Sequence, residues 1–164
     1  MSEISVRIAR PNEIERAGEI VAEAYLADGL LANAGDYEDH LRDAGDRAAN
    51  AELLVAVDSD GTVLGSVTVA PHGTKYAEVA RQGELEFRML ATAVAAQGRG
   101  VGELLTRAVL GRARELGCQR VVLCLMESNV RAQRLYGRLG FTRLPERDWR
   151  PHPGLRLLAF GVEL

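Results

Sequence analysis

The feature that most constrains this chain is a glycine-rich hexapeptide, Gln97-Gly98-Arg99-Gly100-Val101-Gly102, which stands where one hydrophobic pattern gives way to another. The residues before it, from Leu85 to Val94, alternate and then become apolar, which predicts a strand that enters the core. The residues after it place apolar side chains on one face of a helix, at Val101, Leu104, Leu105, Ala108 and Val109. The hexapeptide is therefore the predicted loop of a strand-loop-helix unit.

Such a loop predicts an anion site. The first N–H groups of a helix have no intrahelical acceptor, and glycines leave the backbone bare there. The helix dipole adds to the attraction, so phosphate oxygens are the natural ligand of the amides from Arg99 to Gly102. Glu103 and Leu105 stand where a dinucleotide fingerprint needs its third glycine, and the only lysine, Lys75, lies outside the loop. An NAD-type site and a P-loop are thereby both disfavoured.

Two motifs resemble the GCN5-related N-acetyltransferase (GNAT) family. Gln97-x-x-Gly100-x-Gly102 is similar to its first signature, although Val94 stands where many members have proline. Asn129-x-x-Ala132-x-x-Leu135-Tyr136-x-x-Leu139-Gly140-Phe141 looks like its second motif, at the usual distance. The resemblance is close from about Leu85 to Phe141. It implies one α/β domain over residues 1–164 with the GNAT acyl-CoA N-acyltransferase fold, a central mixed sheet with splayed parallel strands flanked by helices.

The rest of the chain fits this order of elements. Apolar alternation and short apolar runs predict strands near residues 2–8, 53–57, 63–69, 120–125, 141–144 and 155–162. Helical periodicity and capping residues predict helices after Pro11, near 37–44, over 101–116 and after Ser128 or Asn129. The strands on either side of the central helix should be parallel and joined by a right-handed crossover. Residues 71–83 and 145–154 are predicted to be loops.

The resemblance implies that acetyl-CoA is the cosubstrate. Its pyrophosphate would lie on Gln97, Gly98, Arg99, Gly100, Val101 and Gly102, and its pantetheine arm would meet backbone groups of Leu90, Ala91 and Thr92. Asn129 would cap its helix and also reach the cofactor arm. No metal is expected, because two cysteines and three scattered histidines form no ligand pattern.

Acetylation of an amine needs a base, since a free aliphatic amine with a pKa of roughly 10 is mostly protonated at neutral pH. Glu86 matches a position where several family members carry a catalytic glutamate, whereas an alternating strand also places glutamates in solvent without any role. Glu84 and Glu127 are weaker competitors, and Cys124 occupies a place where some relatives carry a basic glutamate.

The resemblance also implies that Tyr136 donates a proton to the departing thiolate. By spacing alone, Tyr136 is a core residue beside Leu135 and Leu139. A backbone amide near Leu90 to Thr92 would stabilise the developing oxyanion.

The sequence constrains the identity of the acceptor less than that of the cosubstrate. In the family it is shaped by segments that correspond here to residues 27–50, 70–83 and 145–154, with His72, Tyr76, Trp149 and His152 as candidate pocket residues. The run from Asp36 to Asp46 is locally acidic, which is typical of a solvated helix face or of a lid that attracts a cation.

Composition sets the remaining expectations. At 164 residues, with 47% hydrophobic and 26% charged residues, the chain is ordinary for a globular protein. A net charge of -3 gives no general attraction to nucleic acid or an anionic membrane. With neither a long apolar run nor a signal sequence, a cytoplasmic protein is expected.

Two function classes follow from these observations. The first is an acetyltransferase that transfers the acetyl group of acetyl-CoA to a primary amine by direct attack in a ternary complex. Its partners would be acetyl-CoA and the acceptor, and the sequence leaves open whether the protein forms a homodimer. The second is a non-catalytic acyl-CoA-binding module of the same fold.

Overall fold

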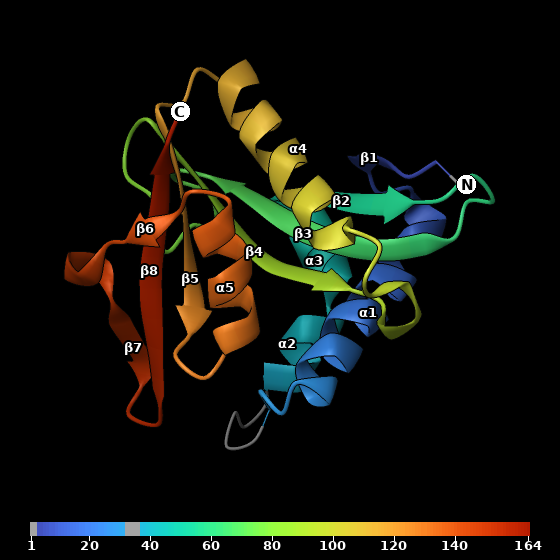
Figure 1. Ribbon diagram of the computed structural model, residues 1–164, viewed down its shortest axis with the longest axis horizontal. Coiled ribbons are helices and arrows are strands. Elements are labelled where there is room, and N and C mark those ends of the chain that lie inside the picture. Colours follow the sequence, from blue (N-terminus) through green and yellow to red (C-terminus); the bar gives the residue numbers. More distant parts are fainter. Residues whose placement is uncertain (1–2, 32–36) are drawn as a thin grey trace.

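The computed structural model describes residues 3–31 and 37–164, and its strands form one eight-stranded sheet (Figure 1). The strands are β1 Ser5–Ile8, β2 Glu52–Val57, β3 Val63–Pro71, β4 Glu84–Thr92, β5 Arg120–Met126, β6 Thr142–Arg143, β7 Trp149–His152 and β8 Leu155–Glu163. The helices are α1 Ile14–Ala27, α2 Tyr37–Arg42, α3 Ala44–Asn50, α4 Val101–Glu115 and α5 Val130–Arg138, with short 3-10 turns η1 Pro11–Glu13, η2 Val94–Ala96 and η3 Pro145–Arg147. The strand order is β1-β2-β3-β4-β5-β8-β6, and β7 pairs with β8.

Most predicted elements are confirmed, and the differences are local. The prediction of a loop over 145–154 is wrong, because β7 forms a hairpin with β8 through the pairs Trp149↔Leu157 and His152↔Leu155. A sheet edge tolerates Pro151, which lacks an N–H group. The central strand ends at Thr92 rather than at Val94, which is 55% exposed in η2. Ser2 and Asp36 lie outside the described residues.

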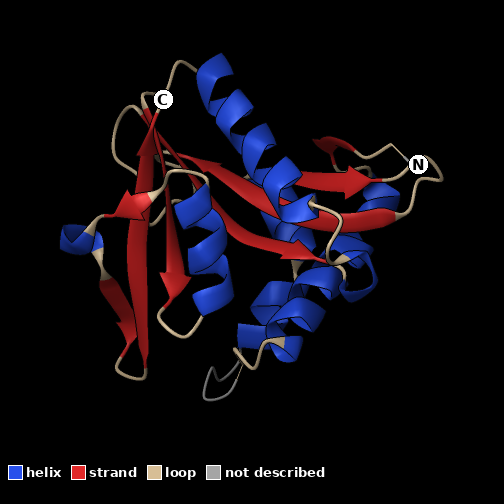
Figure 2. Cartoon of the chain, viewed as in Figure 1, coloured by secondary structure: helices blue, strands red, loops and turns tan. Residues whose placement is uncertain are grey.

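The two central strands are parallel, as predicted, but they stay together only briefly. Their ladder consists of Glu84↔Arg120, Leu85↔Val121 and Glu86↔Val122, although β4 continues to Thr92 and β5 to Met126. Figure 2 shows the result: β5, β8 and α5 lean to one side, and β1 to β4 with α1 lean to the other. The predicted splay is confirmed, and it leaves one edge of β4 without a strand neighbour.

A β-bulge changes the direction of side chains at the open part of β4. Three steps along β4, from Arg88 to Ala91, match two along β3, from Thr68 to Ser66. Met89 within this stretch has a φ of 54°, which is unusual for a residue with a side chain. Met89 then lines the cavities on one side of the strand, while Leu90 lines the cavity on the other.

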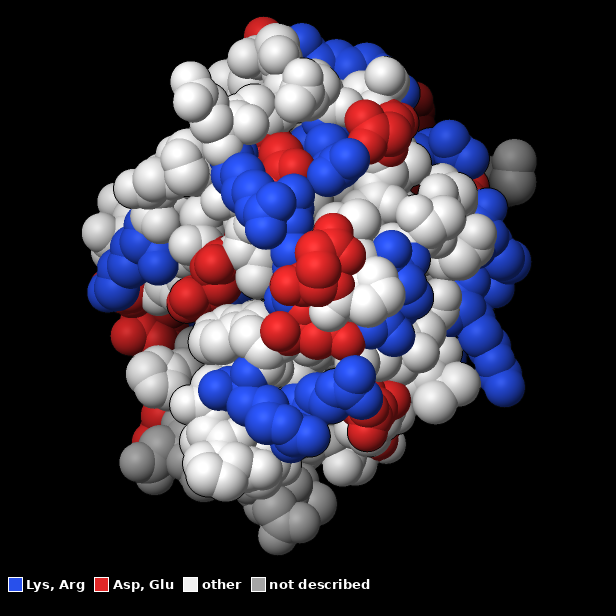
Figure 3. All heavy atoms as spheres, turned by 90° about the vertical axis from the view of Figure 1, so that its left-hand side faces the viewer, with Lys and Arg blue, Asp and Glu red and all other residues white. Residues whose placement is uncertain are grey.

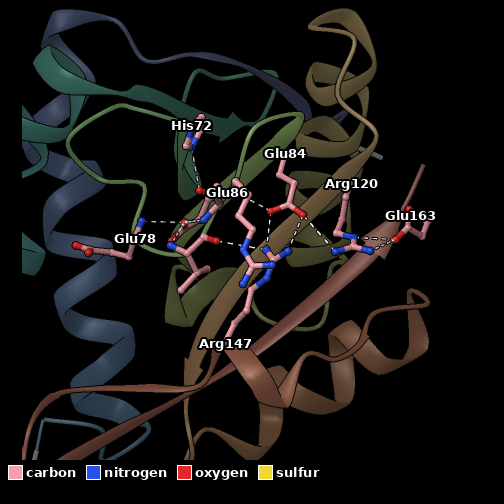
Figure 4. Close-up of polar contacts among 10 residues, drawn as sticks. His72, Glu78, Glu84, Glu86, Arg120, Arg147 and Glu163 are labelled. Atoms are coloured by element: carbon pink, nitrogen blue, oxygen red, sulfur yellow. Dashed lines mark hydrogen bonds and ion pairs between the residues drawn. The ribbon is translucent and has the colours of Figure 1, made fainter.

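Charged side chains connect β4 and β5 at the end where the two strands are still paired (Figure 4). Glu84 binds Arg147 through two hydrogen bonds of 2.5 and 2.9 Å, and Arg120 Nη1 lies 3.2 Å from Glu84 Oε2. Burial by itself raises the pKa of Glu84, but hydrogen bonds from Arg147 and from the backbone N–H of Arg81 outweigh it, so the pKa is lowered. Glu84 thus connects β4 to β5 and to η3 where the strands are still paired.

Helix α4 lies against β2, β3 and β4, and its approach depends on a glycine. A Cβ atom built at Gly65 of β3 would lie 2.7 Å from the Ala91 carbonyl oxygen, 2.8 Å from Val101 Cγ1 and 3.2 Å from Leu105 Cδ1. Val101 and Leu105 are themselves buried. The absence of a side chain at Gly65 therefore sets how closely the first turns of α4 sit on the sheet.

We expect Gly65→Ala to lower the free energy of unfolding by about 1–3 kcal/mol, because the methyl group overpacks against backbone that cannot move cheaply. Gly111→Ala, inside α4 with no atom within 4 Å of the added methyl group, is the matched control. It should instead stabilise by about 0.5–1 kcal/mol, the usual gain of alanine over glycine in a helix. Urea unfolding of the two variants measures both effects, and a neutral Gly65→Ala would contradict the close packing.

Candidate functional site

A cavity of about 420 Å³ lies between the end of β4, the start of α4 and helix α5. Ten residues predicted to bind the cofactor line it: Leu90, Ala91, Thr92, Gln97, Gly98, Gly100, Val101, Gly102, Asn129 and Tyr136. Arg99 belongs to the same loop but does not line the cavity. The structure thus brings three separate stretches of sequence to one cleft, which we call the cofactor cleft.

The glycine loop has the geometry of an anion site, and its glycines act in two ways. Gly98 and Gly100 have φ angles of 83° and 74°, a left-handed conformation that favours glycine, and open space surrounds both. Gly102 has an ordinary φ, but a Cβ there would lie 3.2 Å from Leu135 Cδ2, against the wall of the cleft. Within the described residues, the first N–H groups of α4 have no acceptor, and the first intrahelical bond is donated by Leu104 to Gly100.

Sequence reasoning missed part of the cleft wall. Tyr25 of α1 lines it together with Asp28 and Leu30, which follow the helix, because α1 packs across β4. Arg131 also lines it and lies between two walls, with Nη2 3.4 Å from Gln97 Oε1 and Nη1 3.5 Å from Asp28 Oδ1. The sequence predicts that the apolar face of α1 packs in the core, so no local pattern indicates that Tyr25 lines a cavity.

Helix α5 begins as its sequence predicts. The side chain of Asn129 accepts a hydrogen bond of 3.2 Å from the N–H of Ala132, so Asn129 rather than Ser128 caps the helix. Asn129 also lines the cofactor cleft. The cap is confirmed, and its position permits the second role that the resemblance implies.

A second, larger cavity of about 600 Å³ lies on the other side of β4. Its wall comes from the three segments expected to shape the acceptor site, through Tyr37, His40, Asp43, Asp46, Lys75, Tyr76, Glu78, Trp149, Pro151 and His152, together with Arg88, Met89, Leu155 and Leu157. His72, also a candidate, lies elsewhere and bonds the carbonyl of Ala80 at 2.9 Å. We call this cavity the acceptor pocket.

Polar contacts hold the walls of the acceptor pocket. Arg47 is fully buried and donates to the carbonyl oxygens of His40 and Leu41 at 2.7 and 2.8 Å, which joins α3 to the end of α2. Asp46 binds Lys75 at 2.8 Å and also accepts a hydrogen bond from Tyr76. Asp46 therefore connects α3 to the loop that precedes β4.

A small cavity of about 30 Å³ lies between the two large ones. Tyr25 lines both it and the cofactor cleft, while Trp149 and Met89 line both it and the acceptor pocket. Glu86 and Cys124 also form its wall. Glu86 is thus placed at the junction between the two large cavities.

Glu86 is buried. Its side chain holds the preceding loop through hydrogen bonds that Figure 4 draws as dashed lines. Its Oε1 accepts hydrogen bonds of 2.8–2.9 Å from the backbone N–H groups of Glu78, Val79 and Ala80. Its Oε2 is buried and has no hydrogen-bond partner among the described residues. Burial raises the pKa of Glu86, and the backbone hydrogen bonds together with Arg88 oppose this without offsetting it. The expectation of a glutamate in solvent does not apply to this position.

Tyr136 packs in the core and lines the cofactor cleft at the same time. It is 2% exposed, and its ring meets those of Phe87 and Phe141 edge to face at centroid distances of 5.5 Å. Burial raises the pKa of Tyr136 well above its ordinary value, so the phenol stays protonated at neutral pH. The two expectations for this residue, core packing and contact with the cleft, are therefore compatible.

The competing acids lie away from the three cavities. Glu84 is held by Arg147 and Arg120, and Glu127 Oε2 binds Arg156 at 2.6 Å on the surface.

Burial, with the charge of Glu86, raises the pKa of the Cys124 thiol to about 12. Cys124 therefore remains a neutral thiol at physiological pH.

The face of the molecule shown in Figure 3 mixes both signs of charge. Several arginines of the C-terminal half pair with acids: Arg120 with Glu163, Arg143 with Asp148, and Arg156 with Asp148 at 3.2 Å.

Within residues 3–31 and 37–164, no group of three or more His, Cys, Asp or Glu side chains is placed to hold a metal ion. No helix in the same ranges is long and apolar enough to cross a membrane.

A mixed sheet opened between two parallel strands, with a glycine loop on one side of the opening and a second pocket on the other, is the architecture of acyl-CoA N-acyltransferases. The model of the acetyltransferase (GNAT) family matches residues 17–141, and the chain belongs to this family. The fold is similar to that of a GNAT-family acetyltransferase from Staphylococcus aureus Mu50, with a TM-score of 0.74, 12% identity and 99% of each chain covered.

Two further similarities bear on the ligand. The Salmonella typhimurium protein yncA, whose structure holds its cofactor acetyl-CoA, matches with a TM-score of 0.66 and 21% identity over 99% of this chain and 95% of that one. A mycothiol acetyltransferase of Stackebrandtia nassauensis is 42% identical over 91 residues, which are 56% of this chain and 28% of the relative. The chain spans less than a third of the length of the curated relatives it matches.

The loop geometry predicts the effect of Gly102→Val. The added side chain should fill the wall of the cleft beside Leu135 and lower the affinity for coenzyme A at least tenfold, as measured by calorimetry. Gly100→Val should have a similar effect for a different reason, because valine disfavours the left-handed conformation. Gly111→Ala is the control, and unchanged affinity in both loop variants would place the phosphate site elsewhere.

Proposed function

We propose that this chain transfers the acetyl group of acetyl-CoA to a primary amine by direct attack within a ternary complex. The observation that supports this most is the meeting of two cavities at one strand: the cofactor cleft and the acceptor pocket lie on opposite sides of β4, with Glu86 between them. Two substrates held in this way meet without a covalent enzyme intermediate.

The cleft fits coenzyme A on physical grounds. The bare first turn of α4 suits a pyrophosphate. The charged side chains of the wall, Arg131 and Arg138 with Asp28 and Glu103, balance in number, so the backbone N–H groups are the main anion-binding feature. Leu90, Ala91 and Thr92 lie on the edge of β4 that has no strand partner beyond Glu86, so their backbone groups are free of the ladder on that side. An extended pantetheine arm can bond such an edge as a strand would.

The chain's own groups suit the proton movements of the reaction. Acetyl-CoA supplies an activated acyl group as a thioester. Glu86, with one carboxylate oxygen unbonded, takes the proton that the ammonium group must lose before attack. Tyr136, protonated at neutral pH, gives a proton to the sulfur that leaves, and the phenolate then takes up the second proton that the attacking nitrogen must lose. Backbone N–H groups near Leu90 to Thr92 stabilise the negative charge that develops on the carbonyl oxygen.

One observation favours the second candidate, a non-catalytic acyl-CoA-binding module. The three backbone hydrogen bonds to Glu86 Oε1 give that carboxylate a structural role that needs no turnover. Consumption of acetyl-CoA with a panel of primary amines separates the two candidates. Release of coenzyme A that depends on the amine supports the enzyme, and binding without release supports the module.

Glu86→Gln tests the base. Glutamine still offers an oxygen to the three backbone N–H groups, so the fold and coenzyme A binding should persist. The wild-type profile of kcat/KM should rise with pH through the raised pKa of Glu86, since only the ionised carboxylate accepts a proton. The variant should lack this rising limb, and its kcat should fall at least tenfold. The fall in kcat should be smaller for an acceptor of lower amine pKa. Wild-type rates on both acceptors would remove Glu86 from the mechanism.

Tyr136→Phe should lower kcat about tenfold or more and leave the affinity for acetyl-CoA near wild type, as expected of a group used mainly in the transition state. Tyr25→Phe is the matched control, because Tyr25 is a second phenol that lines the cofactor cleft. Steady-state kinetics and calorimetry on both variants give the comparison. An equal loss in the two variants, or a loss only in Tyr25→Phe, would assign the proton donor differently.

A further inference from the structure

Arg88 is a guanidinium group placed beside the proposed base. It follows Glu86 by two residues on β4 and lines both the small cavity and the acceptor pocket. Its side chain is 19% exposed, so the charge is largely removed from bulk water. A cation in such a position is stable only when hydrogen-bond acceptors or anions replace the lost water.

The chain itself supplies Arg88 with weak partners. Nη1 lies 3.5 Å from the backbone oxygen of Tyr76 and 3.6 Å from Glu78 Oε1, and the guanidinium carbon stands 6.0 Å from the centre of the Tyr76 ring. Nε and Nη2 make no hydrogen bond to the described residues. Strong charge-assisted hydrogen bonds are about 2.7–2.9 Å long, so most of the donating capacity of this guanidinium is unused.

The spacing between Glu86 and Arg88 limits the shape of a ligand that meets both. The strand is regular here, with Arg88 opposite Thr68 and Glu86 opposite Ala70, so both side chains leave the same face. Their Cα atoms are then about 6.6–6.8 Å apart. Glu86 and Arg88 also line the same small cavity of about 30 Å³, so a molecule whose amine meets Glu86 and whose anionic group meets Arg88 carries these two groups close together, as an amino acid does.

The acids of the acceptor pocket do not favour a polycation over such a molecule. Asp46 is bound to Lys75 and Tyr76, and Glu78 lies beside Arg88. Asp43 accepts a hydrogen bond from the N–H of Asp46 at 3.2 Å and caps α3. Asp46 and Asp43 therefore have close partners within the chain, whereas Glu78 and Arg88 share only one contact of 3.6 Å and the guanidinium keeps spare donors.

We propose that the acceptor is a primary amine that also bears a carboxylate, and that Arg88 binds this carboxylate while the amine faces Glu86. The planar guanidinium matches a carboxylate through two parallel hydrogen bonds. Arg88 is then a specificity-determining residue. The inference rests on the proposed acetyl transfer and narrows its substrate class.

Matched acceptors test the inference. Leucine, leucinamide and 3-methylbutylamine share a side chain, and only leucine has the carboxylate; phenylalanine and methionine give parallel sets. Coenzyme A release is measured for wild type, Arg88→Gln and Arg88→Lys, with Lys75→Gln as the control because Lys75 is another cation of the same pocket. Each variant is compared with wild type on the same acceptor, so differences in amine pKa cancel.

Wild type should prefer the amino acids to their amides. Arg88→Gln should lower kcat/KM about 10- to 100-fold more for the amino acids than for the amides and amines. Any loss that all three acceptor types share comes from Glu86, because the charge of Arg88 lowers the pKa of Glu86. Arg88→Lys should keep part of the preference, and Lys75→Gln should keep all of it. Thermal unfolding checks that each variant is folded.

A binding measurement separates this inference from the proposed function. Trp149 is the only tryptophan and lines the same pocket as Arg88, so its fluorescence reports on amino acids added with coenzyme A, without turnover. A signal in wild type that Arg88→Gln weakens supports the inference. Equal loss for all three acceptor types, or turnover of simple amines without preference for amino acids, would overturn it. Failure to acetylate any amine despite a fluorescence response would instead contradict the proposed transfer.

Discussion

The structure depends on the early end of the ladder between β4 and β5. Three residue pairs hold the strands, and beyond Glu86 and Val122 they separate. The paired end is strengthened by Glu84, which binds Arg147 and Arg120, so the opening occurs at one end only. The opening leaves backbone groups of β4 without partners and makes room for cavities on both of its sides. Without it, a continuous sheet would separate the two large cavities.

Glu86 combines a structural and a chemical property in one side chain. One oxygen binds three consecutive N–H groups of the loop before β4, and the other is buried without a partner. The first property keeps the carboxylate ionisable despite burial, because hydrogen bonds favour the charged form. The second keeps an acceptor free at the junction of the cavities. The loop that Glu86 holds also supplies Tyr76 and Glu78 to the acceptor pocket, so one loop both fixes the Glu86 carboxylate and forms part of the pocket wall.

The glycine loop and the second motif were predictable because they are local. Left-handed glycines, the bare first turn of α4 and the Asn129 cap each depend on neighbours within a few residues. Tyr136 shows the limit of this reasoning, since its spacing indicated the core and its motif indicated the cleft. Both are true, because a helix side chain can pack against Phe87 and Phe141 while it lines a cavity.

The sequence by itself determined most of the order of elements, the parallel central strands and the loop at the start of α4, because periodicity and turn chemistry reside in short stretches. Only the tertiary structure decided that Glu86 is buried, that Tyr25 reaches the cleft, and that β7 pairs with β8. The partners of Arg88 and the walls of the acceptor pocket come from segments far apart along the chain. Burial and charge pairing are set by such distant neighbours, and no local pattern encodes them.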